Sequence, residues 1–181
     1  MIQPNIWSFS AQSLTSWMAA YAIWEPISYK IFPTLFKAQT TQEYYNPKRF
    51  SFAVVAMGDF LYSTMLFLVA QQVIGYVFGA GSIITNIWEW CKRLLTFIGV
   101  QWVGDLSFYG FVKSLPEKWT PRYLDFFKRY GAQVGIGAPI GDSLYGIVWL
   151  SLTQWMASNV PQWLQWFFIT TFLFFTLVVS F

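Results

Sequence analysis

Histidine is absent from this chain of 181 residues, cysteine occurs once, at Cys91, and charged residues make up only 10% of the sequence. Without histidine there is no imidazole base, no Ser-His-Asp triad and no histidine-ligated haem or zinc. A single cysteine excludes an intramolecular disulfide and a cysteine-based metal cluster. The common catalytic and metal centres are thereby removed, so we expect no enzymatic activity, no metal and no cofactor.

The residues that are abundant are apolar: 56% of the chain is hydrophobic and 22% is aromatic. Globular domains carry about 25% charged residues, far more than this chain does. Tryptophan and phenylalanine suit lipid contact and membrane interfaces. The composition predicts an all-α integral membrane protein with the lipid bilayer as its first partner. It indicates neither nucleic-acid binding nor a small-molecule substrate.

Four segments are long and apolar enough to cross a bilayer, which takes about 20 helical residues. They are residues 50–78, 94–112, 134–157 and 160–180. Asn159 and Pro161 are typical of the start of a helix, which supports the last of these boundaries. We therefore expect a four-helix transmembrane domain over residues 50–181.

Residues 1–49 are predicted to form a separate N-terminal interfacial segment. Within residues 7–24, one helical stripe is apolar and consists of Leu14, Trp17, Met18 and Tyr21. The apolar run is interrupted by Gln12, Ser13 and Ser16. This amphipathic pattern favours a helix that lies in the membrane interface. A fifth span at this place is the alternative.

The distribution of positive charge predicts the orientation. Nine of the eleven cations lie before the first predicted span or between the second and the third: Lys30, Lys37, Lys48, Arg49, Lys113, Lys118, Arg122, Lys128 and Arg129. Membrane proteins keep such basic connections on the cytoplasmic side. With four spans, both termini are then cytoplasmic, or on the equivalent side of a virion membrane.

Three aspartates inside the predicted spans follow a glycine, in "MGDFLYST", "VGDLSFYG" and "IGDSLYGI". Each motif also holds a tyrosine, and the members are Gly58, Asp59 and Tyr62; Gly104, Asp105 and Tyr109; and Gly141, Asp142 and Tyr145. The first and third motifs form a weak internal repeat at an offset of 83 residues, each followed by a glutamine, Gln71 or Gln154.

The spacing from the basic segments predicts that the three aspartates lie at a similar depth. Asp59 is ten residues beyond Arg49, about 15 Å along a helix. Asp105 is eight residues before Lys113, about 12 Å. Asp142 follows the second basic segment at a comparable distance. Because a carboxylate in hydrocarbon costs at least about 2.5–3.5 kcal/mol, all three should face the interior of the bundle.

Two interpretations of these aspartates remain open. In the first they form a polar clasp, in which glycine allows close helix approach and the carboxyl accepts a hydrogen bond from a tyrosine of a neighbouring helix. In the second, Asp59, Asp105 and Asp142 bind a cation or carry protons, with Gln71 and Gln154 as lining. The two interpretations differ in hydration: a clasp excludes water, whereas a transport site needs a path that water can enter.

A catalytic interpretation fails on the sequence of the motifs. Intramembrane aspartyl proteases carry Gly-x-Gly-Asp, which requires a glycine three residues before the aspartate. The corresponding positions here are Ala56, Trp102 and Pro139.

The segments "VGDLSFYGFVKSLPEKW" and "FFKRYGAQVGIGAPIGDSLYG" resemble small multi-span membrane proteins of large icosahedral DNA viruses, which lie in the inner membrane beneath the capsid. The resemblance covers residues 50–156 and transfers no residue role. It implies a structural role in a virion or another crowded assembly, with homo- or hetero-oligomeric membrane or capsid proteins as partners. A subunit of an organelle membrane complex would fit the same composition. We therefore predict a structural multi-pass membrane protein, and a small cation or proton transporter or channel is the alternative.

Overall fold

The computed structural model describes residues 5–79 and 84–179, and within these ranges the chain is helical, without strands. The elements are α1 (Ala11–Leu35), α2 (Gln39–Tyr44), α3 (Phe52–Phe78), α4 (Ile87–Ser114), a 3-10 helix (Glu117–Trp119), α5 (Arg122–Val134), α6 (Gly137–Asn159) and α7 (Gln162–Val179). The all-α class predicted from the sequence is confirmed.

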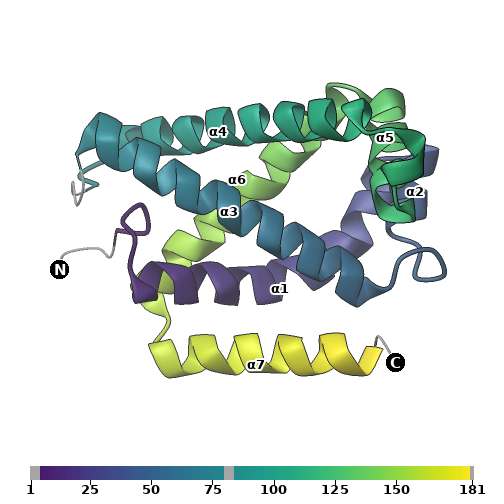
Figure 1. The fold of residues 1–181 in the computed structure, drawn as a ribbon. Helices are drawn as coiled ribbons and strands as arrows, with labels where there is room; N and C mark the ends of the chain where they lie inside the picture. The colour runs from purple at the N-terminus through teal and green to yellow at the C-terminus, as the bar shows by residue number, and fades with distance from the viewer. Residues whose placement is uncertain (1–4, 80–83, 180–181) are drawn as a thin grey trace.

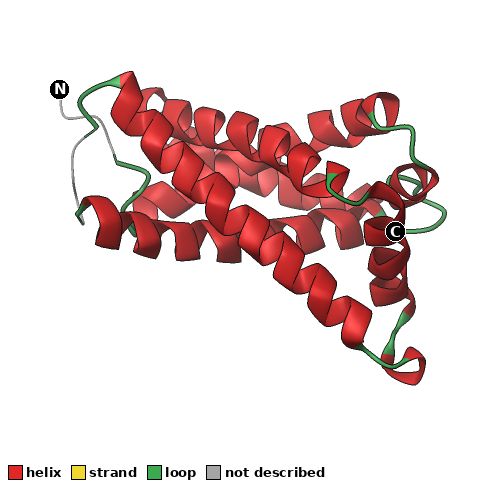
Figure 2. Cartoon of the chain, turned by 90° about the horizontal axis from the view of Figure 1, so that it is seen from above, coloured by secondary structure: helices red, strands yellow, loops and turns green. Residues whose placement is uncertain are grey.

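The five long helices form an elongated bundle, and the two short helices stand across one of its ends (Figures 1 and 2). Helices α1, α4 and α7 run in one direction, and α3 and α6 return in the other (Figure 1). As a result, α1 begins and α7 ends at opposite ends of the bundle. This order differs from the expectation of four long helices with both termini on one side, because α1 is a fifth member of the bundle.

Local signals in the sequence set the helix ends. Ser10 and Ser13 form a reciprocal capping box at the start of α1. The side chain of Asn86 accepts a hydrogen bond from the backbone N–H of Glu89, 3.0 Å away, and caps α4. Gly79 and Gly135 follow α3 and α5 with φ of 89° and 56°, a region where side chains are unfavourable.

Trp17 of α1 lies at the centre of the bundle and is fully buried. Its ring stacks on Phe67 of α3 at 4.2 Å and on Trp149 of α6 at 3.7 Å between centroids. Its indole N–H donates to Thr64 of α3 at 2.9 Å. The indole N–H of Trp149 donates to the backbone oxygen of Trp17, also at 2.9 Å. One aromatic stack therefore joins three helices.

Residues 7–24, predicted to lie in the membrane interface, lead into α1, which packs among the other helices; their place relative to a membrane stays a prediction. Two of the polar residues that interrupt this apolar run contact other helices. Ser16 is fully buried and donates to Gln165 of α7 at 3.0 Å, and Gln12 donates to the backbone oxygen of Ala157 in α6 at 3.4 Å. Since α1 packs most extensively against α6 and α7, residues 11–35 belong to the same bundle as the later helices.

A second aromatic cluster fills the end of the bundle crossed by the short helices. It consists of Tyr44, Phe50, Val55 and Phe126, and the rings of Tyr44 and Phe126 stack at 5.2 Å. A bidentate ion pair joins the same two helices, with nitrogen–oxygen distances of 2.9 and 3.1 Å between Arg129 and Glu43. The hydrogen bonds from Arg129 hold the pKa of Glu43 below its ordinary value. Helices α2 and α5 are thereby fixed to each other.

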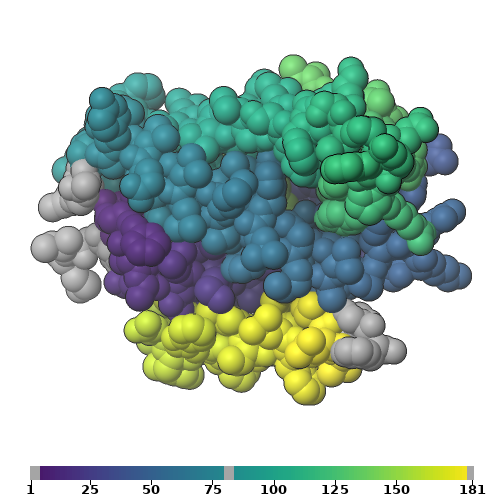
Figure 3. Space-filling view, in the orientation of Figure 1, coloured from purple at the N-terminus to yellow at the C-terminus, as the bar shows by residue number. Residues whose placement is uncertain are grey.

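By length and composition, α3 is the one helix in the described ranges that could cross a membrane, and the apolar helix Gln162–Val178 is shorter. The other long helices carry charges near their ends or polar residues in the middle, such as Glu25 in α1 and Lys92 in α4. Helix α7 lies along one outer side of the molecule (Figure 3). Its outer face is apolar, with Trp163 71% and Phe174 63% exposed.

Candidate functional site: an acidic chamber

A cavity of about 920 Å³ lies between α3, α4, α5, α6 and the segment that joins α1 to α2. Asp59, Asp105 and Asp142 all line it, so we call it the acidic chamber. The only cation among its described lining residues is Lys37, whose side chain is exposed. The chamber therefore combines three carboxyl groups with one basic group at its edge.

Each aspartate has a different environment. Asp59 accepts a hydrogen bond from the hydroxyl of Tyr44 at 2.6 Å. Asp105 accepts one from the hydroxyl of Tyr62 at 2.8 Å, through Oδ1, while its buried Oδ2 has no partner. Asp142 makes no hydrogen bond or ion pair within the described part of the chain. The acceptor capacity of the chamber is thus only partly used.

The tyrosines of the three motifs do not bind the aspartates of their own motifs. Tyr62 of α3 reaches Asp105 of α4, which joins two motifs across a helix interface. Tyr145 of α6 donates instead to Glu25 of α1 at 2.6 Å. The ring of Tyr109 packs against Gly131 of α5. One of the three motif tyrosines therefore makes the clasp contact that the sequence suggested.

Two of the three motif glycines stand where another helix approaches closely. A Cβ atom at Gly58 would lie 2.6 Å from the hydroxyl of Tyr123, and one at Gly104 would lie 2.5 Å from Cδ2 of Leu66. At Gly141 the nearest atom is an ordinary 3.5 Å away, on Phe36. Close approach thus requires glycine at the first two motifs.

The two glutamines proposed as lining lie elsewhere. Gln71 donates to the backbone oxygens of Ile6 at 2.7 Å and Ser8 at 3.3 Å, and so fastens the segment before α1 to α3. Gln154 donates to Ser158 at 3.2 Å. The glutamine that does line the chamber is Gln101 of α4.

The three aspartates share the chamber without forming a metal site. No group of three histidine, cysteine, aspartate or glutamate side chains in the described ranges is close enough to hold a metal ion. The alternative in which Asp59, Asp105 and Asp142 together ligate one inorganic cation therefore finds no support in this geometry.

Sequence reasoning missed two tyrosine–carboxyl contacts around the chamber. Glu25, 1% exposed, accepts from Tyr145 and from Ser28 within α1. Tyr44 belongs to α2, and burial raises the pKa of its hydroxyl well above the ordinary value, so it remains a donor to Asp59. An acidic residue between Trp24 and Pro26 in an apolar stretch was the available signal for Glu25.

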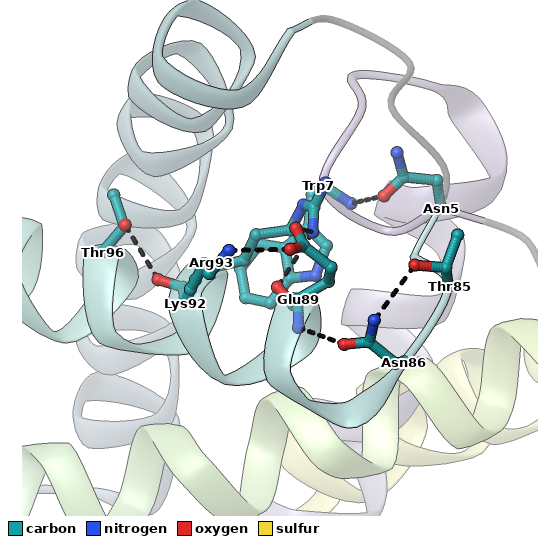
Figure 4. A network of polar contacts seen from close by, with 8 residues as sticks. All are labelled: Asn5, Trp7, Thr85, Asn86, Glu89, Lys92, Arg93 and Thr96. Carbon is teal, nitrogen blue, oxygen red and sulfur yellow. Dashed lines mark hydrogen bonds and ion pairs between the residues drawn. The ribbon is translucent and has the colours of Figure 1, made fainter.

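A further polar cluster surrounds the start of α4, at the end of the bundle away from α2 and α5 (Figure 4). Arg93 is only 1% exposed and donates to Glu89 through its backbone oxygen at 2.9 Å and its carboxylate at 3.3 Å. Lys92 donates to the same carboxylate at 2.7 Å. Arg93, which lies just outside the predicted span over residues 94–112, is therefore a buried part of α4.

Comparison with known proteins adds no assignment: no family model, curated protein or solved structure has significant similarity to this chain. The geometry defines a helical bundle with an acid-lined chamber. Function is therefore inferred from that chamber.

Proposed function

We propose that this chain is a multi-pass membrane protein that binds a positively charged solute in the acidic chamber. The observation that carries the proposal is the charge of the lining: Asp59, Asp105 and Asp142 face one cavity whose only basic lining residue in the described ranges is the exposed Lys37. A cleft lined by one sign of charge concentrates ions of the opposite sign. Such a chamber favours cations over anions.

The membrane location is supported by the composition and by the surface. Helix α3 is long and apolar enough to cross a bilayer, and the outer face of α7 exposes large apolar side chains. The nine cations of the two basic segments gather toward the end where α2 and α5 stand. We propose that α3, which alone among the described helices meets the criterion of length and composition, crosses the membrane together with α1, α4, α6 and α7, which lie alongside it in one bundle (Figure 1). The basic end would then lie on the cytoplasmic side or its equivalent.

An architectural role in a membrane assembly, including a viral inner membrane, is the second candidate. The observation that favours it is the set of hydrogen bonds between helices, such as Tyr62 to Asp105 and Ser16 to Gln165. These bonds hold the bundle together without any ligand. A purely architectural bundle, however, does not account for a chamber of about 920 Å³.

The two candidates differ in whether the chamber selects cations. The test introduces a single cysteine at Ser63, which lines the chamber, in a chain where Cys91 is replaced by serine. Its reaction rates with a cationic and an anionic methanethiosulfonate reagent are compared. The reference is a cysteine at the exposed Ser114 at the end of α4.

If the proposal is right, the cation-to-anion rate ratio at position 63 exceeds the ratio at position 114 by about tenfold or more. Adding Asp105→Asn or Asp142→Asn should reduce this preference, because each removes one acidic group from the chamber. Asp125→Asn is the matched control, since Asp125 is exposed on α5 and outside the chamber. Equal ratios at the two positions would refute cation selection and leave the architectural candidate.

A further inference from the structure

We propose that the solute is an organic ammonium: a protonated primary amine attached to an apolar, aromatic body, with no acidic group. This inference rests on the proposed function and names the chemical class that the chamber would take. It places the ammonium between α4 and α6, where Gln101, Asp105 and Asp142 line the chamber together.

Three hydrogen-bond donors near these groups are already engaged. The hydroxyl of Tyr62 donates to Oδ1 of Asp105, and that of Tyr44 donates to Asp59. The indole N–H of Trp102 donates to Ser143 at 2.8 Å. Within the described ranges, Oδ2 of Asp105 and the carboxyl group of Asp142 accept no hydrogen bond and retain their acceptor capacity.

Gln101 provides a second, independent acceptor beside Asp105. It lies one turn before Asp105 on α4, and residues four apart share a helix face. Its side chain lines the chamber and is 7% exposed, and its Oε1 accepts no hydrogen bond from the described part of the chain. A buried acceptor without a donor is costly, by about 1–3 kcal/mol. A ligand that brings N–H donors to this pair relieves that cost.

These acceptors distinguish among cations. A quaternary ammonium brings charge but no N–H, so it leaves Gln101 and Asp105 without donors. A metal ion requires several ligands converging on one point, and no such group of acidic side chains is present in the described ranges. A primary ammonium carries three N–H donors and one positive charge, which match the two free acceptors and the neighbouring Asp142.

The remaining wall suits an apolar body. Aromatic side chains dominate it, among them Phe97, Trp102, Phe108, Tyr109 and Trp149. Ligand pockets of about 300–1,000 Å³ are lined mainly by such groups, with a few polar anchors, and aromatic faces also attract cations. A ligand with its own carboxylate or phosphate, including the headgroup of an amino lipid, would bring negative charge close to three acidic side chains. Such a ligand should therefore bind less well than a simple amine.

The test titrates three related compounds into the full chain in phosphatidylcholine nanodiscs and follows the fluorescence of its tryptophans, two of which, Trp102 and Trp149, line the chamber. The compounds are phenethylamine, its N-trimethylated analogue, and free phenylalanine, which adds a carboxylate to the same skeleton. Nanodiscs containing phosphatidylethanolamine form a further arm, in which a lipid headgroup would compete with the amine.

Phenethylamine should bind at least about tenfold more tightly than the trimethylated analogue, the equivalent of one charged hydrogen bond. Phenylalanine should not compete, and phosphatidylethanolamine should not weaken amine binding. Gln101→Leu and Asp105→Asn should each weaken phenethylamine about tenfold, whereas Asp125→Asn should leave its affinity unchanged. Asp105→Asn preserves the shape of the side chain and should fold. Asp142→Asn provides a second variant if Asp105→Asn fails to fold.

Equal affinity for the trimethylated analogue would overturn the requirement for N–H donors. Competition by phosphatidylethanolamine would reassign the site to a lipid headgroup. No binding of phenethylamine, together with a preserved cation preference at position 63, would refute this inference while the proposed function stands. Loss of that preference as well would refute both.

Discussion

The hydroxyl of Tyr62 on α3 donates to Oδ1 of Asp105 on α4 at 2.8 Å, so two of the three Gly-Asp motifs are joined through one hydrogen bond. Tyr62→Phe removes the donor and leaves both oxygens of Asp105 without a partner. Hydrogen bonds between membrane helices average about 0.6 kcal/mol and reach about 1.7. We expect Tyr62→Phe to lower the free energy of unfolding by about 1 kcal/mol, measured by denaturant titration in detergent micelles.

The control for this prediction is Tyr76→Phe, because Tyr76 is 93% exposed on the same helix. Asp105→Asn retains an acceptor oxygen and should cost less than Asp105→Leu, which deprives Tyr62 of its partner. A Tyr62→Phe protein as stable as the parent would show that the bond contributes nothing to helix packing.

Gly104 is predicted to be intolerant of any side chain. A Cβ atom there would meet Leu66 and lie 3.2 Å from the hydroxyl of Tyr62. Gly104→Ala should therefore destabilise the protein by about 1–3 kcal/mol through overpacking. Gly110 lies in the same helix with nothing within 4 Å of its Cβ position, so Gly110→Ala is the matched control. It should be neutral or stabilising by up to about 1 kcal/mol, the helix-propensity gain.

The fifth long helix leads to a topological prediction. In a Cys91→Ser chain, single cysteines at Phe9, before α1, and at Asn159, the last residue of α6, should be labelled from the same side of the membrane. A cysteine at Lys118, between α4 and α5, should be labelled from the other side. If α1 instead lay in the interface and only four helices crossed, position 9 would be labelled together with position 118.

The ion pair between Glu43 and Arg129 predicts a defined pH dependence. The pKa of Glu43 is lower in the folded state than its ordinary value of 4.5, so the pair stabilises the fold above that value. This contribution disappears as the pH falls through the folded-state pKa. Glu43→Gln should therefore lower stability by about 0.2–1 kcal/mol near pH 7, and this difference should shrink as the pH falls through the folded-state pKa of Glu43. Thermal unfolding as a function of pH measures this, with the exposed Glu117→Gln as control.

Helix positions were predictable where the determinants are local. The apolar run over residues 50–78 became α3 (Phe52–Phe78), and Pro161 stands before α7. The place of α1 was not predictable in this way. Ser16 buries its hydroxyl against Gln165, a residue 149 positions away. A sequence pattern cannot distinguish a polar side chain that faces water from one that faces a glutamine of another helix.

For the candidate site, too, only the features that depend on spacing along the chain were predictable. Spacing from the basic segments indicated a common depth for the three aspartates, and the structure brings all three to one chamber. The pairing of Tyr62 with Asp105, and of Tyr44 with Asp59, depends on how each helix is rotated about its axis. The chamber itself is a gap left by packing, and Gln101 belongs to it through a rotation that no local motif specifies.

The central place of α1 has a consequence for biosynthesis. Trp17 stacks on Trp149, and Ser16 bonds a glutamine made 149 residues later. At about 5–20 residues per second, the ribosome needs on the order of ten seconds or more to complete that interval. During this time α1 has Phe67 of α3 as a stacking partner, but its second aromatic partner and its contacts with α7 do not yet exist. Helix α1 therefore leaves the ribosome before the helices that complete its packing, and Glu25 lacks its partner Tyr145 until 120 further residues have been made.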